Sequence, residues 1–277
     1  MITSGTNEQA FECLIEKALV GTSAEERKAQ GLTDIEAQQP EAGKYYWGSP
    51  KDFDKKTALD LRRLWSFLHN TQQQELDKYV GRDLKADVEK EIDTCIKTFG
   101  IIQLLRKGIE INNIKLKLFY PKPSAADSEQ SQKEYASNQF SITRQQTFSI
   151  QNPELEIDMV LYVNGIPLFT FELKNPWTHQ TARYNGQKQY KSSERNPKET
   201  LLNYGRCLAH FTLDKDEVFF TTKLDLAKTF FMPFNKGLAN GQGAGNPVNI
   251  DGGYKTAYLW EQILQQDTVA DIIMNYV

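Results

Sequence analysis

The feature that most constrains the fold is an apolar hairpin in the middle of the chain. Residues 157–174 read Ile-Asp-Met-Val-Leu-Tyr-Val-Asn-Gly-Ile-Pro-Leu-Phe-Thr-Phe-Glu-Leu-Lys. Two apolar runs that meet at Asn164-Gly165 are typical of a β-hairpin, because Asn and Gly tolerate the backbone angles of its turn. The odd-numbered positions in 157–163 and 169–173 are apolar, so they predict one face that covers a core.

Three charged residues interrupt these strands: Asp158, Glu172 and Lys174. An unpaired charge is strongly disfavoured in a buried strand, so their presence needs a reason. Asp followed by Glu-x-Lys across a hairpin is the order of a metal-dependent phosphodiesterase site. The alternative interpretation is a solvated strand end with an incidental Asp and a Glu–Lys pair, because the motif is short.

The register of the hairpin decides whether the two carboxylates meet. A two-residue turn at Asn164-Gly165 leaves Asp158 facing away from Glu172. A three-residue loop, 163–165, with Gly165 as a left-handed bulge, brings Asp158 onto the face of Glu172. We therefore predict the bulged hairpin, or a bulge elsewhere with the same effect.

Paired carboxylates at this position favour a bound cation. Two carboxylates about 5 Å apart repel by roughly 3 kcal/mol at an effective dielectric of about 20. Protonation relieves the repulsion, and so does Mg²⁺, which takes one or two carboxylates and keeps waters for a phosphate. Lys174 can position a water or stabilise charge on the reacting phosphate. The pattern predicts Asp158 and Glu172 as Mg²⁺ ligands beside a catalytic lysine.

Composition limits the class of protein. The 277 residues are 39% hydrophobic and 25% charged, as in ordinary soluble globular chains. The longest apolar run is the interrupted hairpin, so no transmembrane span or membrane partner is expected. Three scattered cysteines without Cys-x-x-Cys spacing and an N-terminus without a signal core indicate a cytoplasmic protein. The net charge of −3 disfavours autonomous DNA binding, which would need a local basic patch or a partner.

Helices are expected on both sides of this hairpin. Apolar periodicity predicts a first helix over 7–20, on which Glu12 belongs to an acidic flank that is either solvated or directed at the metal. A helical block over about 55–107 is expected to be an insertion, and its last helix, 84–107, is expected to tolerate a break near Gly100. Residues 199–210 are expected to form an amphipathic helix and 217–222 a short strand. The stretch 233–253 is rich in Gly and Asn, but no Gly-Lys-Ser/Thr follows it and no Walker A sequence occurs, so we expect no ATPase activity.

Seven segments in a shared order resemble the N-terminal part of the motor (R, or HsdR) subunit of type I restriction endonucleases. These segments are Trp65–Gln72, Asn113–Tyr120, Phe140–Gln145, Phe169–Pro176, Arg206–Phe211, Phe231–Gly237 and Tyr258–Glu261. The resemblance covers nearly the whole chain.

This resemblance implies an α/β fold of the restriction-endonuclease-like (PD-(D/E)xK, RecB-like) kind, a mixed sheet flanked by helices, in one endonuclease domain over 1–277. It implies a type I site-specific deoxyribonuclease that cleaves double-stranded DNA with Mg²⁺. Asp158 and Glu172 are the implied metal ligands and Lys174 the implied catalytic lysine, with Glu12 as the acidic residue of the first helix.

The family also carries a Gln-x-x-x-Tyr motif after the lysine, and two pairs approximate it. Gln180 and Tyr184 have the right spacing but start close to Lys174, whereas Gln187 and Tyr190 lie at the more familiar distance and are one residue short. Helical spacing places either pair on one face, so it does not choose between them. We prefer Gln187 and Tyr190.

The implied partners are double-stranded DNA and the methyltransferase (M) and specificity (S) subunits of a type I complex. ATP is expected only for a full-length family member, whose translocase motor would follow this region. Two alternatives remain: a catalytically minor docking module for the motor and methyltransferase subunits, and a stand-alone DNA repair nuclease.

Overall fold

The centre of the molecule is a seven-stranded mixed sheet. The computed structural model describes residues 4–32, 40–124, 127–175, 179–238, 241–248 and 253–276. The strand order is β1-β6-β7-β8-β9-β10-β11, with parallel pairing only between β1 and β6 and between β8 and β9. The strands are β1 Tyr46–Trp47, β6 Phe140–Thr147, β7 Glu156–Val163, β8 Ile166–Leu173, β9 Ala209–Leu213, β10 Val218–Thr221 and β11 Met232–Pro233.

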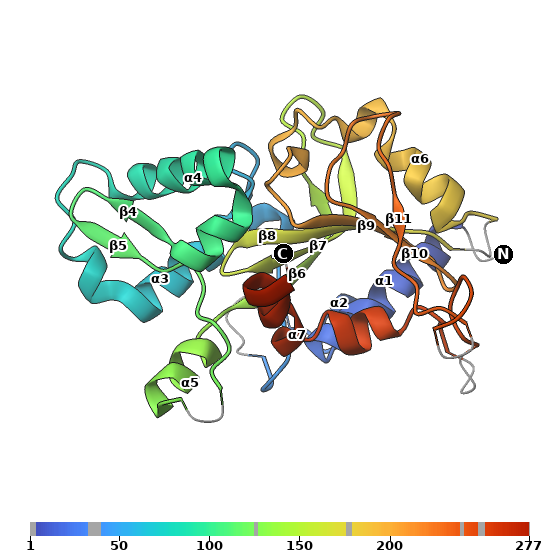
Figure 1. Ribbon diagram of the computed structural model, residues 1–277, viewed down its shortest axis with the longest axis horizontal. Helices are drawn as coiled ribbons and strands as arrows, with labels where there is room; N and C mark the ends of the chain where they lie inside the picture. The colour runs from blue at the N-terminus through green and yellow to red at the C-terminus, as the bar shows by residue number, and fades with distance from the viewer. Residues whose placement is uncertain are drawn as a thin grey trace.

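Helices cover both faces of this sheet. In Figure 1, α1 (Ser4–Val20), α2 (Ala24–Ala29) and α7 (Gln266–Asp271) lie below the sheet, and α6 (Gln187–Tyr190) lies above its right-hand end. Two hydrophobic clusters match this arrangement. The larger contains the apolar side chains of α1, and the smaller contains Tyr190 of α6. The chain is therefore an α/β protein with a mixed sheet between helices, as expected, and is compatible with a restriction-endonuclease-like fold.

The central hairpin has a two-residue turn. Asn164 and Gly165 have φ angles of 50° and 79°, and Val163 pairs with Ile166. Two successive positive φ angles match the right-handed twist of the flanking strands, which is why Asn-Gly suits this turn. The predicted three-residue loop is therefore wrong.

A bulge elsewhere in the hairpin produces the predicted register. The register shifts between Leu161 and Tyr162, which leaves one extra residue on β8 beside Pro167. Proline has no N–H to donate, so an irregular ladder is tolerated at this point. Continued one residue past the paired part of the ladder, this register sets Asp158 opposite Glu172.

A second lobe lies at the left-hand end of the sheet in Figure 1. It consists of α3 (Leu61–Leu76), α4 (Leu84–Lys107) and the small hairpin of β4 (Ile109–Ile111) and β5 (Ile114–Leu116). Both helices fall largely within the predicted helical block. Helix α4 has the predicted bounds and breaks at Gly100, where φ is 80°. The two-stranded pair of β2 (Phe53–Asp54) and β3 (Leu59–Asp60) precedes α3.

The central turn joins this lobe to the sheet. The Asp60 amide donates to the carbonyl of Gly165 at 2.9 Å. A side chain at Gly165 would overlap the Asp60 carbonyl and approach the Leu64 amide to 2.6 Å. The buried Asn164 side chain accepts from the Gln139 amide at 2.7 Å and takes part in the same junction.

One expected helix, over 199–210, is absent: these residues form a short 3₁₀ turn, turns and bends, and the start of a strand. Residues 199–210 contain a short 3₁₀ turn, Thr200–Leu202, and the chain then enters β9 at Ala209. All five residues of β9 are buried. A strand covered on both faces has no alternating pattern, so its apolar run is easily mistaken for part of a helix. The short strand predicted over 217–222 is confirmed as β10.

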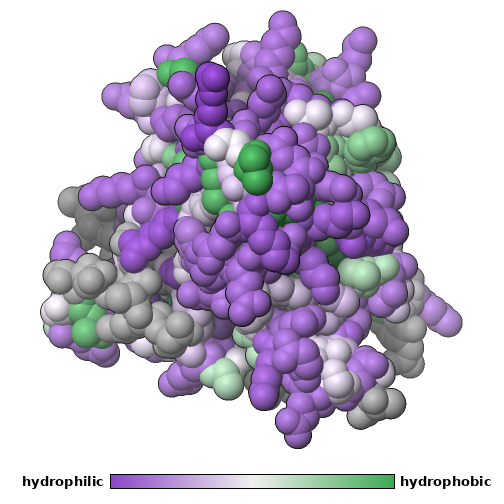
Figure 2. Space-filling model, turned by 90° about the vertical axis from the view of Figure 1, so that its left-hand side faces the viewer, coloured by the Kyte–Doolittle hydropathy of each residue, from purple (hydrophilic) through white to green (hydrophobic). Residues whose placement is uncertain are grey.

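The surface at the lobe end of the molecule is mainly polar. Figure 2 shows that face as predominantly hydrophilic, with hydrophobic residues in separate places. Among the described residues, no helix combines the length and apolar character that crossing a membrane requires.

Because Gly165 lies in close contact with α3, adding a single methyl group there should greatly lower the free energy of unfolding. Gly165→Ala should cost about 1 kcal/mol for the positive φ and about 1–3 kcal/mol more for the overlap with α3. Gly43 has almost the same φ, 78°, with open space around it, so Gly43→Ala should show only the first cost. Urea unfolding of both variants measures the difference, and equal losses would contradict this account of the turn.

Asp60, the N-cap of α3, predicts a pH-dependent stability. Its carboxylate accepts from the Arg63 amide at 2.9 Å, and burial raises its pKa to about 7. The unfolded value is about 3.9, so unfolding releases a proton between about pH 4 and pH 7, and the stabilising contribution of Asp60 falls as pH rises through that window. Asp60→Asn preserves the cap but does not titrate. As pH rises through this window, the free energy of unfolding of the variant should therefore increase relative to that of the wild type by up to about 1.4 kcal/mol per pH unit.

Urea unfolding at several pH values in that window tests this prediction. Asp83→Asn, the same change at the exposed N-cap of α4, is the matched control. A pH dependence of equal size in both variants would show that burial of Asp60 is not its cause.

Candidate functional site

Asp158 and Lys174 meet at the ends of β7 and β8. The Leu173 amide donates to Asp158 Oδ2 at 2.6 Å, and Lys174 Nζ lies 4.0 Å from the same oxygen. The Asp158 side chain is 24% exposed and that of Lys174 is 7% exposed. The site therefore opens towards solvent on the Asp158 side, with the lysine beneath.

The backbone around Asp158 is distorted. Gln145, the residue of β6 opposite Asp158, has a φ of 50°, and the ladder contacts resume on either side of it. Ile157 packs in the smaller cluster, whereas Met159 packs in the larger one. The prediction that Ile157 shares the larger core with the other odd-numbered residues is therefore wrong. The distortion lets Asp158 reach the backbone of β8.

Glu172 is fully buried and is paired with an arginine that sequence reasoning missed. Arg195 Nε donates to Glu172 Oε1 at 2.6 Å, and a second guanidinium nitrogen donates to the Glu156 carbonyl at 2.6 Å. The guanidinium carbon also lies 5.4 Å from the centre of the Phe148 ring. A carboxylate in the middle of an apolar strand requires a cation nearby. That requirement could have directed the search to the arginines that follow Glu172 in the sequence.

Burial changes the ionisation of both carboxyl groups. It raises the pKa of Glu172 to about 8; the Asp158 carboxylate adds to the effect, and Arg195 and Lys174 oppose it. Burial likewise raises the pKa of Asp158, against Lys174 and the Leu173 amide. Within the described part of the chain, Glu172 Oε2 has no hydrogen-bond partner. A buried carboxyl oxygen without a partner is an open position for a ligand.

Glu12 lies on the other side of the sheet. It belongs to α1, whose apolar residues pack in the larger cluster, and its Oε2 accepts from Arg144 Nε at 2.9 Å. Arg144 is the partner of Met159 across β6 and β7, so its side chain leaves the face opposite Glu172. The structure brings Asp158, Glu172 and Lys174 together and places Glu12 in a separate ion pair.

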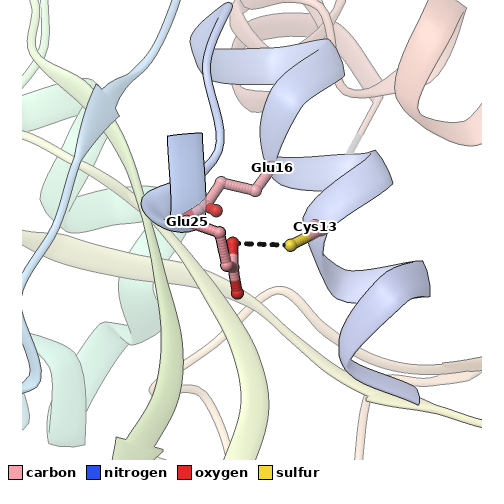
Figure 3. Close-up of side chains that lie close together, drawn as sticks. All are labelled: Cys13, Glu16 and Glu25. Atoms are coloured by element: carbon pink, nitrogen blue, oxygen red, sulfur yellow. Dashed lines mark hydrogen bonds between the residues drawn. The ribbon is translucent and has the colours of Figure 1, made fainter. Parts of the chain in front are cut away.

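Three more groups of α1 and α2 surround the same arginine. Figure 3 shows Cys13, Glu16 and Glu25 directed towards one another, close enough for a metal ion. Arg144 lies 3.2 Å from a Glu16 oxygen and 3.1 Å from a Glu25 oxygen. One guanidinium is thus shared by three carboxylates, Glu12 included, and it offsets only part of their charge. Among the described residues, Glu16 Oε1 is also buried without a hydrogen-bond partner. The cluster holds an arginine that ties α1 and α2 to β6.

The two candidate Gln/Tyr pairs occupy different environments. Tyr190 is fully buried, and its hydroxyl lies 2.7 Å from Thr170 Oγ1, two residues before Glu172 on the same strand face. Tyr184 is 74% exposed. Gln187 is half-buried on α6, and Gln180 precedes the turn that leads to it. Position alone places Tyr190, and not Tyr184, beneath the carboxylates.

The donor set fits a hard divalent cation. Asp158 and Glu172 supply carboxylate oxygens, one of them buried without a partner, and a partly open side remains for water and a phosphate. Arg195 occupies the other Glu172 oxygen, so a cation would approach from the Asp158 side.

The comparison with protein families finds one match. A family model described as the type I restriction enzyme R protein N terminus matches residues 39–229. No curated protein matches the chain. The matched region contains Asp158, Glu172, Lys174 and Arg195, whereas Glu12 precedes it.

The Glu172–Arg195 pair predicts a large loss of stability when one partner is removed. Above about pH 8, where Glu172 is ionised, Arg195→Met should destabilise the fold by about 3–5 kcal/mol, because it leaves a buried carboxylate without its cation. Arg183→Met is the matched control: Arg183 pairs with Glu217 at a half-exposed position, so it should cost no more than about 1 kcal/mol.

Adding Glu172→Gln to Arg195→Met should recover part of that loss, because no buried charge then remains unpaired. Denaturant unfolding of the two single variants and the double variant gives the coupling free energy. Additive losses would show that the two side chains do not stabilise each other.

Proposed function

The chain belongs to the family of type I restriction enzyme R protein N termini, and on this premise we propose that it is the Mg²⁺-dependent endonuclease region of such a subunit. Its substrate is double-stranded DNA, and the bonds that it cuts are phosphodiesters. The observation that carries the proposal is the convergence of Asp158, Lys174 and the partnerless oxygen of the buried Glu172 at one opening of the sheet.

Asp158 and Glu172 would hold the cation. A bound Mg²⁺ supplies Lewis-acid stabilisation of a phosphate and a more acidic water. The protein's own part is to fix two carboxylates on neighbouring strands. The Leu173 amide orients Asp158 and Arg195 orients Glu172, so neither carboxylate has to be ordered when substrate arrives.

Lys174 supplies a positive charge at the reacting phosphate. Its ammonium is almost buried and lies beside Asp158, where water screens it little. From there it stabilises charge that develops on the phosphate oxygens and holds the attacking water. The proposed pair Gln187 and Tyr190 supports this site from α6, with Tyr190 hydrogen-bonded to Thr170 under Glu172.

The proposed setting is a complex with methyltransferase and specificity subunits, in which a motor outside these residues uses ATP. A docking module is the alternative from another functional class. Among the described residues on the face in Figure 2, the surface is predominantly hydrophilic.

Substitution of two site residues tests the nuclease proposal. In the complete complex, Asp158→Asn and Lys174→Met should each slow Mg²⁺-dependent plasmid cleavage at least about 100-fold and leave ATP hydrolysis intact. Asp158→Asn should also weaken Mn²⁺ binding by the chain, measured by calorimetry. Glu172 variants would not separate catalysis from folding, because they also leave the buried Arg195 without its carboxylate.

The pair of Asp267 and Lys122 provides matched controls. It is another Asp–Lys pair, with 3.0 Å between Lys122 Nζ and Asp267 Oδ2, on the exposed surface near α7. Asp267→Asn and Lys122→Met should cleave like the wild type. Normal cleavage by folded Asp158→Asn and Lys174→Met would place the nuclease site elsewhere and favour docking.

A further inference from the structure

A second surface, next to the proposed nuclease site, is built to hold a ligand. It is a groove of about 770 Å³ between the turn that carries Arg183, Tyr184 and Gln187 and the loop after β11 that carries Lys236 and 241–245. Phe219 and Phe231 also line it. In Figure 1 these segments lie at the right-hand end of the sheet, beside α6 and β11.

The two walls of the groove are basic in an otherwise acidic protein. The stretch 180–193 contains three cations and no acidic residue, and 226–248 contains two lysines and no acidic residue. The chain as a whole has a net charge of −3. Glu217 is the one acidic residue among those that line the groove, and it is paired with Arg183 at 2.6 Å. Two cations, Arg183 and Lys236, and one acidic residue therefore line the groove, a balance that favours an anionic ligand.

An aromatic side chain projects into solvent at its rim. Tyr184 is 74% exposed, although large aromatic side chains usually gain stability by burial. Arg183, the preceding residue, is half-exposed, and its guanidinium carbon lies 5.0 Å from the centre of the buried Phe219 ring. A flat base can stack on an exposed ring such as that of Tyr184, and stacking is sequence-tolerant because every base has a π face.

The opposite wall has little side-chain bulk. Gly237, Gly241, Gly243 and Gly245 all line the groove, and all four have positive φ angles. The Gly237 amide donates to the Gly245 carbonyl at 2.9 Å, which closes the loop on itself. A wall of this kind lets a sugar-phosphate backbone approach closely. It lies beyond residue 229, where the family match ends.

The turn that forms one wall of the groove also contacts the proposed nuclease site. Gly186, between Tyr184 and Gln187, has no room for a side chain: a Cβ there would overlap the Thr212 hydroxyl and lie 3.5 Å from Lys174 Cγ. The groove-forming turn therefore rests directly on the strand end that carries Lys174.

We propose that this groove binds a single strand of DNA leading away from the proposed cleavage site, with one base stacked on Tyr184 and phosphates near Arg183 and Lys236. Aromatic rings beside a basic channel are how proteins hold single strands without reading sequence. This inference rests on the proposed nuclease function, since the adjoining site gives the strand its direction.

Fluorescence anisotropy of the whole chain in EDTA, with labelled oligothymidine and a blunt duplex of equal length, tests the proposal. Oligothymidine should bind more tightly than the duplex, and its affinity should fall with added salt. Tyr184→Ala should weaken single-strand binding roughly 5- to 100-fold. Lys236→Gln should weaken it and reduce the slope of log affinity against log salt by about 0.7.

Tyr204→Ala is the matched control for the aromatic residue, because Tyr204 is 68% exposed and has Lys223 5.7 Å from its ring, yet does not line the groove. Lys133→Gln on α5 (Glu129–Ala136) is the control for charge. Both should bind like the wild type.

Three results would overturn the proposal: wild-type affinity in Tyr184→Ala, an equal loss in Tyr204→Ala, or displacement of DNA by polyglutamate as effectively as by oligothymidine. The assay contains no Mg²⁺ and needs no cleavage. A chain that binds single strands but does not cleave would contradict only the nuclease proposal. A chain that cleaves but does not bind single strands through Tyr184 would contradict only the groove proposal.

Discussion

The burial of one carboxylate, Glu172, on a central strand governs how the upper half of the molecule is built. Removing such a charge from water is costly unless a cation replaces the lost solvation. Arg195 provides that cation, and to reach Glu172 the chain after β8 must fold back over the sheet. The segment that returns also carries Tyr190, so one charge requirement positions the ion pair and the aromatic residue together.

The sheet carries a charged cluster on each face, and in both clusters an arginine holds buried carboxyl groups. Arg144 contacts Glu12, Glu16 and Glu25, so it offsets part of their charge and ties α1 and α2 to β6. In the other cluster Glu172 Oε2 has no partner among the described residues and lies next to a partly exposed Asp158. Within the part of the chain that the structure describes, each cluster therefore has one buried carboxyl oxygen without a hydrogen-bond partner, Glu16 Oε1 on one face and Glu172 Oε2 on the other, and only Glu172 lies within the family match.

Much of the candidate site follows from local pattern. The hairpin, the place of its turn at Asn164-Gly165 and the convergence of Asp158 with Lys174 were predictable, because side-chain alternation and turn chemistry act over a few residues. The predicted three-residue form of the turn was wrong. The sequence predicted that a bulge would set Asp158 opposite Glu172, but it did not predict that the bulge lies beside Pro167. Its position depends on Pro167 and on how the turn packs against α3, and a local pattern does not contain that contact.

The sequence by itself determined the central strands, the breaking of α4 at Gly100 and the family to which the chain belongs. Only the tertiary structure decided that Arg195 pairs with Glu172 and that Arg144 holds Glu12 on the opposite face. It also decided that 209–213 form a strand between β8 and β10. The physical reason is range: periodicity and turns depend on neighbours in the chain, whereas ion pairs and buried strands depend on residues that only folding brings together.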